Sequence, residues 1–257
     1  MIHENYLKRI KQLRLIDDDF MSMVFDNNIE ATQLMINIIL QRADIRVKSV
    51  KAQYEVKSVE GHSVKFDIFA VDDTGKPYDI EIQRSDKGAV PQRARYNSAL
   101  LDANSLNKSE QYANFKDTYI IFITENDVLK GGLPLYHIER KIEELNNDSF
   151  NDGSHIIFVN GAYRANDDIG KLMYDFHCTD SDDMNFDVLS KKVSYFKETK
   201  GGHANMCRIF EEIQDERAIE IAKKLLIKGD TIEEVSECTG LPIETIKRLV
   251  SELSNNK

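Results

Sequence analysis

Residues 64–83, VKFDIFAVDDTGKPYDIEIQ, contain two runs of β-branched and aromatic residues on either side of a polar turn. The Asp-Thr-Gly in the middle suits a three-residue hairpin loop that ends with Gly75 in the left-handed conformation. Such a turn fixes the pairing of the two strands and places Asp67 directly opposite Glu81. The stretch therefore predicts an antiparallel hairpin in which two carboxylates face each other.

The two faces of this predicted hairpin differ in chemistry. Side chains alternate across a strand, so Asp79, Glu81 and Gln83 share the face of Asp67, while the apolar residues between them point into a core. Directly opposed like charges cost roughly 0.2–1 kcal/mol. A divalent cation held between the carboxylates removes this cost. Two alternatives stay open: a solvated acidic face with no ligand, and a two-residue turn that would break the pairing.

At these residues the chain resembles a known group of nucleases. Asp67, thirteen further residues and then Glu81-Ile82-Gln83 resemble the PD-(D/E)xK signature, with Gln83 in the position usually held by Lys. The sequence around this motif is similar to the Rpn family of recombination-promoting nucleases and transposases. The similar blocks are QRARY at 92–96, GLPLYHIER at 132–140, DGSHIIFVNG at 152–161 and KLMYDF at 171–176.

The resemblance implies an α/β fold with a restriction-endonuclease-like αβββαβ core, in which helices flank a mixed central sheet. It also implies a Mg²⁺-dependent DNA endonuclease that hydrolyses phosphodiester bonds, with Mn²⁺ as a substitute ion. Asp67, Glu81 and the Ile82 carbonyl would hold the metal, and Asp67, Glu81 and Gln83 would be catalytic. Gln83 can orient a water but brings no positive charge. Lys65, two residues before Asp67 on the same strand face, is another source of that charge.

The composition limits how the chain can contact DNA. The net charge of −10 argues against a strong nonspecific grip, which depends on Lys and Arg displacing counterions. Contact must therefore be local. No apolar run approaches the ~20 residues that span a bilayer, and the first residues lack a signal-peptide core. We therefore expect a cytoplasmic protein without a membrane partner.

The segment after the hairpin is the best candidate for phosphate contacts. From Arg84 to Arg95 it has four basic residues and one acidic residue, and Pro91 suits the first turn of a helix that starts near residue 90. Arg93 and Tyr96 share a face of that helix. The predicted nucleic-acid-binding residues are Arg84, Lys87, Arg93 and Tyr96. An ordinary basic helix surface is the alternative, and Asn97 replaces the last Tyr of the family pattern QRxRYY.

The rest of the first 202 residues supplies the other expected elements. These are helices at about 4–14 and from Phe20 towards Gln41, and strands at about 45–57, 118–124 and 155–161. Glu30 on the second helix is either a further metal ligand or an exposed acid. His137 and His155 are either structural residues or neighbours of the site.

The C-terminal part of the chain has a different character. We expect a nuclease-like domain at 1–202 and a helical, helix-turn-helix-like tail at 203–257, with Gly201-Gly202 as a linker and helix breaks at 229–230 and 240–242. From residue 230 onward the tail has three basic and six acidic residues. This balance leaves groove binding and a packing or homodimer module as alternatives.

Two functions of different classes follow from the sequence. One is the metal-dependent DNA endonuclease described above. The other is a catalytically degenerate, transposase-derived protein that binds nucleic acid or a partner without cleavage. Gln83 and the acidic balance favour the second, whereas the retention of Asp67 and Glu81 in one register favours the first.

Overall fold

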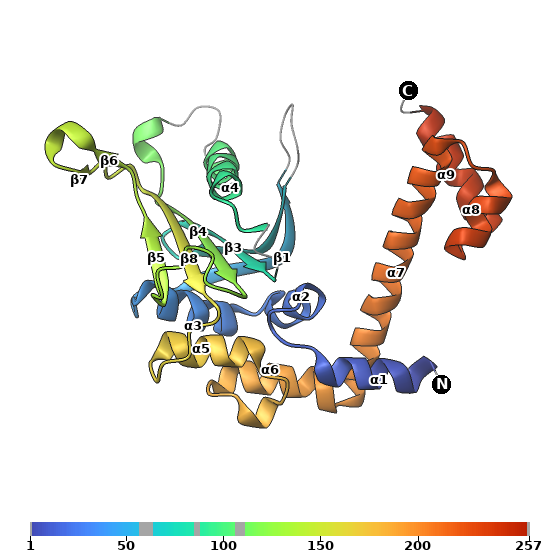
Figure 1. Cartoon of the computed structure of the whole chain (residues 1–257), viewed down its shortest axis with the longest axis horizontal. Helices are drawn as coiled ribbons and strands as arrows, with labels where there is room; N and C mark the ends of the chain where they lie inside the picture. The colour runs from blue at the N-terminus through green and yellow to red at the C-terminus, as the bar shows by residue number, and fades with distance from the viewer. Residues whose placement is uncertain (1, 57–63, 85–87, 106–110, 256–257) are drawn as a thin grey trace. The chain divides into compact units, whose positions relative to one another are not determined.

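The fold is built around a mixed β-sheet, which Figure 1 shows from its edge. The computed structural model describes residues 2–56, 64–84, 88–105 and 111–255. Six strands lie in the order β1-β2-β3-β4-β8-β5, and β6 with β7 form a separate two-stranded pair. Their bounds are β1 Val47–Val56, β2 Val64–Asp72, β3 Pro77–Gln83, β4 Thr118–Thr124, β5 Leu135–Ile138, β6 Lys141–Ile142, β7 Asp148–Ser149 and β8 Ser154–Asn160.

Strand direction changes at the middle of this sheet. β1, β2 and β3 are antiparallel neighbours, and β3, β4 and β8 run parallel. A parallel neighbour needs a crossover, which α4 (Pro91–Ser105) provides between β3 and β4. The order helix, three strands, helix, strand therefore confirms the predicted restriction-endonuclease-like α/β core. The antiparallel edge strand β5 was not predicted.

The hairpin of β2 and β3 has the predicted turn and register. Gly75 has φ +84°, and the Asp72 N–H donates to the Lys76 carbonyl at 3.1 Å. Phe69 pairs with Asp79, and Ile68 pairs with Ile80. One further step along both strands brings Asp67 level with Glu81, as expected.

Helices cover both faces of the sheet (Figure 1). α4 lies over one face and packs on a core that includes Phe66, Ile120, Phe122 and Phe158. On the opposite side, α2 (Asp18–Phe25) and α3 (Ile29–Leu40) contact the antiparallel strands, and α5 (Asp168–His177) packs on α3. None of the described helices is long and apolar enough to cross a lipid bilayer.

The expected helix from Phe20 to Gln41 is wrong in one respect, because the chain forms two helices there. α2 ends at Phe25, and Asn27 takes a left-handed conformation with φ +53°. Asn28 then caps α3, since its side-chain oxygen accepts from the Ala31 N–H at 3.2 Å. The two asparagines therefore end one helix and begin the next. The expected first helix corresponds to α1 (Ile2–Gln12).

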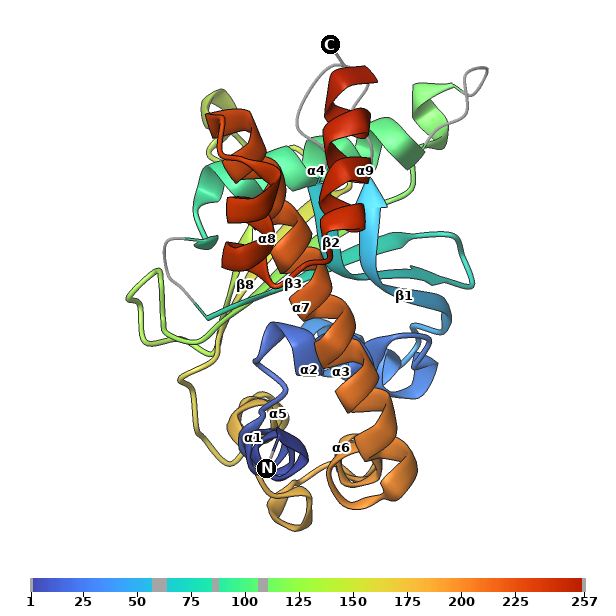
Figure 2. The same cartoon turned by 90° about the vertical axis from the view of Figure 1, so that its right-hand side faces the viewer.

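The chain divides into two compact units, one at residues 11–194 and one that joins residues 1–10 to residues 195–257. Figure 2 shows the three C-terminal helices of the second unit. α6 (Asp187–Glu198) crosses the division between the units, and α7 (Lys200–Lys228), α8 (Ile232–Thr239) and α9 (Ile243–Asn255) follow it. Ala222, Val235, Leu241, Ile246 and Leu249 are the buried core shared by α7, α8 and α9.

The helix breaks in this helical unit lie where the sequence predicts them. Gly229 and Gly240 end α7 and α8 with φ of +103° and +72°, and Thr231 starts α8 with a capping box. Gly201 and Gly202 lie in the first turn of α7, because the Thr199 side chain caps that helix. The boundary expected between residues 202 and 203 therefore lies inside α7.

Asp72 anchors the hairpin turn. Its Oδ1 accepts hydrogen bonds from the Thr74 N–H and hydroxyl and from the Lys76 N–H, and its Oδ2 accepts from the Tyr78 hydroxyl at 2.9 Å. Burial alone would raise the pKa of Asp72, but these hydrogen bonds outweigh it and lower the pKa. The ionised carboxylate therefore stabilises the turn.

We expect Asp72→Ala to lower the free energy of unfolding by about 2–4 kcal/mol, because it leaves the buried Tyr78 hydroxyl without its acceptor. Urea unfolding at several pH values measures this. A lowered pKa means that the stabilisation is intact at pH 5–7 and is lost only as the pH falls below about 4. Asp73→Ala, a change of an exposed acid in the same turn, is the matched control; an equal loss in both variants would contradict the role of Asp72.

Candidate functional site

Asp67 and Glu81 meet at the open end of the hairpin, beneath α4. The Asp67 Oδ2 accepts a hydrogen bond from the Ile82 N–H at 2.9 Å, which ties the β2 carboxylate to the β3 backbone. Glu81 is fully buried, with 0% of its surface exposed. The two predicted metal ligands are therefore brought together, and the solvated acidic face considered from the sequence is wrong for Glu81.

Burial raises the pKa of both carboxyls. It raises the pKa of Glu81 to about 7, and the negative charge of Asp67 adds to this effect while Arg93 opposes it. Burial likewise raises the pKa of Asp67 to about 6, against the hydrogen bond from Ile82. The site thus holds its carboxylates in an environment that disfavours their charge unless a cation is supplied.

Asp79 is a third carboxyl at this site, and its role was not predicted from the sequence. It is fully buried, and its Oδ2 accepts from the Asn97 amide at 3.0 Å. Burial, and then the charge of Glu81, raise its pKa well above the usual range. Asn97, the position where this chain departs from the family pattern, thus donates a hydrogen bond to the carboxyl two residues before Glu81 on β3. The spacing of Arg93 and Asn97, four residues apart on one helix face, was the available signal.

Arg93 links α4 to the site. Its guanidinium forms an ion pair with Glu81, lies over the Phe122 ring at 5.8 Å from the ring centre, and donates to the Gly88 carbonyl at 3.4 Å. About 34% of the side chain is exposed, so one end reaches the surface. Tyr96, predicted to act beside Arg93, is 40% exposed on the same helix.

Gln83 lies at the end of β3 and contacts the chain that leads into α4. A β-carbon added to Gly88 would stand 2.0 Å from the Gln83 Oε1 and 3.5 Å from the Arg93 Nη1. Only glycine therefore allows the Gln83 side chain to take this position. Lys65 is exposed on β2, close enough for its charge to lower the pKa of Asp67.

The other residues predicted to bind DNA are placed differently. Arg84 pairs with Asp17 at 3.0 Å and approaches Glu125 at 3.9 Å, so acids already neutralise it. Lys87 lies outside the described residues. Of the acids at the start of α2, Asp18 adds to the raised pKa of Asp67. Asp18, rather than Glu30, is thus the helix acid that approaches the site.

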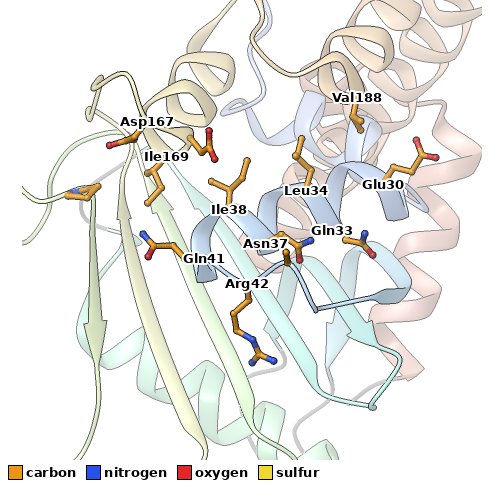
Figure 3. A pocket seen from close by; sticks show the side chains of 13 residues that line it. Glu30, Gln33, Leu34, Asn37, Ile38, Gln41, Arg42, Asp167, Ile169 and Val188 are labelled. Atoms are coloured by element: carbon orange, nitrogen blue, oxygen red, sulfur yellow. The ribbon is translucent and has the colours of Figure 1, made fainter.

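Glu30 and the two histidines lie elsewhere. Glu30 lines a groove of about 930 Å³ between α3 and the start of α5, whose apolar wall includes Leu34 and Ile38 (Figure 3). His155 stacks on Tyr119 with ring centres 4.6 Å apart, and Tyr119 stacks in turn on Tyr78, on the sheet face opposite Glu81. His137 is exposed on β5.

The donor set fits a divalent ion. The Glu81 Oε1 and the Asp79 Oδ1 are buried and accept no hydrogen bond from an N–H or hydroxyl donor of the described residues, and the two carboxyls lie within hydrogen-bond reach of each other. Carboxylate and carbonyl oxygens are the ligands that Mg²⁺ takes, with water filling the remaining positions. The described part of the chain holds no group of three or more His, Cys, Asp or Glu side chains arranged for a metal ion. Asp67, Glu81 and the Ile82 carbonyl would thus be a two-carboxylate site completed by water.

Comparison with known protein families identifies the family of the chain. A model of the PD-(D/E)XK nuclease family transposases matches residues 23–162, more than half of the chain and the whole of the mixed sheet. No curated protein and no solved structure matches the chain. The match covers the hairpin and α4, and it supports a nuclease-type function. The chain therefore belongs to the PD-(D/E)XK nuclease family of transposases.

Proposed function

We propose that this protein is a Mg²⁺-dependent DNA endonuclease that hydrolyses phosphodiester bonds, with Mn²⁺ as a substitute ion. The observation that carries the proposal is the pair of carboxylates, the half-buried Asp67 and the fully buried Glu81, held together within a PD-(D/E)XK fold. A divalent ion bound by Asp67, Glu81 and the Ile82 carbonyl would supply charge stabilisation for the phosphate and acidify a water.

The chain's own groups then have separate tasks. Asp67 keeps a fixed orientation because the Ile82 N–H holds its Oδ2. Gln83, positioned by its contact with Gly88, orients the attacking water through its amide. Arg93, one-third exposed, and Tyr96, 40% exposed, contact the phosphate backbone from α4, with Lys87 as a further contact. Arg84 contributes less, because Asp17 already pairs with it.

We assign residues 203–257 to packing with a second copy of the chain rather than to a DNA groove. The two cations of α9 are already paired, Lys247 with Glu244 at 3.4 Å and Arg248 with Glu252 at 3.8 Å. Paired cations release few counterions from DNA, so this surface contributes little to nucleic-acid affinity. A nuclease-like domain followed by a dimerising helical tail is the arrangement that we propose.

A degenerate, non-cleaving protein is the second candidate, and one contact favours it. Arg93 already supplies Glu81 with a positive charge. If that ion pair were permanent, Glu81 would need no metal, and Gln83 would bring none of the charge of the usual Lys. Nicking of supercoiled DNA with Mg²⁺, Mn²⁺ or EDTA separates the two functions.

We expect Asp67→Asn and Glu81→Gln each to abolish metal-dependent nicking, because each removes one of the two anionic ligands. The assay follows conversion of supercoiled plasmid to open circles by the purified proteins. Asp73→Asn removes an acid of the same hairpin that has no part in the site, and it should nick at the wild-type rate. Nicking by Asp67→Asn at that same rate would remove Asp67 from the site.

We also expect Asp67→Asn to raise the free energy of unfolding of the metal-free protein by about 1–2 kcal/mol at pH 7. Asn keeps an oxygen for the Ile82 N–H but carries no charge. Because the pKa of Asp67 is raised to about 6, the native carboxylate is unfavourable above that pH. The gain should therefore be full at pH 7, shrink as the pH falls from about 6 to 4, and vanish below. Urea melts in EDTA measure it, and equal stability of both proteins at pH 7 would contradict the assigned charge state.

Gln83 gives a further prediction. Gln83→Ala should lower the nicking rate roughly 10²–10³-fold, the scale of one preorganised hydrogen-bonding group, while Mn²⁺ affinity stays nearly unchanged. Gly88→Ala should lower the rate for the same reason, since the new methyl group displaces the Gln83 amide.

The Gln83→Ala/Gly88→Ala double variant tests whether the two residues act together. If Gly88 acts through Gln83, the double variant should be no slower than Gln83→Ala alone. Losses that multiply in the double variant would show that Gly88 acts independently of Gln83.

A further inference from the structure

The ion pair between Glu81 and Arg93 joins the proposed metal site to the proposed DNA surface. Glu81 has no exposed surface, and among the described residues Arg93 is the cation paired with it. Arg93 comes from the first turn of α4 and is one-third exposed, so its guanidinium lies between a buried carboxylate and solvent. The Arg93 side chain therefore belongs to both the proposed metal site and the proposed DNA surface.

Arg93 cannot pair with Glu81 and contact a DNA phosphate at the same time. The guanidinium contacts the Glu81 Oε2, and a divalent ion would bind the same carboxylate. A cation of charge +2 at the same carboxylate repels Arg93 and satisfies Glu81 without it. The remaining contacts of Arg93, a ring face and a carbonyl 3.4 Å away, involve no other anion. Glu81 is thus the anion that contacts Arg93 directly, while Asp67 acts on it only through its charge.

We propose that Arg93 is the counter-ion of Glu81 in the metal-free protein and moves to a DNA phosphate when a divalent ion binds. This inference rests on the proposed function and adds that metal and DNA bind cooperatively through one side chain. Because linkage is reciprocal, the metal must strengthen DNA binding by the factor by which DNA strengthens metal binding. Arg93 also competes with the metal in the absence of DNA.

Arg93→Met tests the competition, because Met keeps contact with Phe122 but carries no charge. Calorimetry of the DNA-free protein should show Mn²⁺ binding about tenfold tighter than in the wild type, within the usual range of coupling between sites. Arg95→Met, an exposed position on the same helix, is the control and should leave Mn²⁺ affinity unchanged. Unchanged or weaker Mn²⁺ binding in Arg93→Met would overturn the inference.

The salt dependence of DNA binding tests whether Arg93 moves to a DNA phosphate when a divalent ion binds. On a 20-base-pair duplex with Ca²⁺, which replaces Mg²⁺ for binding measurements, Arg93→Met should lower the salt slope by about one. In EDTA the slope should be the same in both proteins, since Glu81 then holds Arg93. An equal decrease in Ca²⁺ and in EDTA would show a plain phosphate contact without coupling.

Glu81→Gln provides an isosteric variant in case Arg93→Met does not fold. It frees Arg93 without metal, so DNA binding in EDTA should strengthen and the salt slope should rise by about one. Asp67→Asn removes the same charge but leaves the Arg93 ion pair, and its slope should equal that of the wild type. Equal slopes in Glu81→Gln and Asp67→Asn would overturn the inference. A protein that shows these shifts but never nicks DNA would overturn the proposed function alone.

Discussion

A carboxylate buried under a helix needs a compensating positive group, and Glu81 imposes this requirement on the structure around it. α4 meets the requirement with a polar inner face, in which Arg93 pairs with Glu81 and Asn97 binds Asp79. Ser98 continues this row, with its Oγ 3.0 Å from the Ser154 Oγ. The helix that covers the sheet thus meets the carboxyls with its polar residues as well as the apolar core with Leu100 and Leu101, and its packing depends in part on the same residues as the proposed chemistry.

The parts of the fold that the sequence predicts well are those determined locally. The Asp72–Gly75 turn fixes the hairpin register through hydrogen bonds within a few residues, and strict alternation then places Asp67 and Glu81 on one face. The all-apolar run of β4 is typical of a strand buried on both faces, and it is fully buried here. The motif and the matching family model point to the same hairpin.

What the sequence does not reveal depends on contacts between distant residues or on small differences in capping. Arg84 looks like a free cation in its own segment, but Glu125 and Asp17 reach it from other elements. The break between α2 and α3 depends on Asn27 and Asn28, which helical spacing of the apolar residues conceals. The burial of Asp79 follows only once α4 is placed over the hairpin, because an alternating polar strand face is usually solvated.

The position of Arg93 explains why glutamine rather than lysine is favourable at position 83. A lysine at position 83 would extend towards Gly88, where the Arg93 Nη1 already lies 3.5 Å from the place of an added β-carbon. Two cations in that space would repel each other and would both compete for Glu81. Gln83 avoids the repulsion and keeps a hydrogen-bonding amide, while α4 supplies the positive charge that β3 lacks. Under the proposed function, charge and orientation, which one lysine side chain combines in the common motif, are divided here between a helix and a strand.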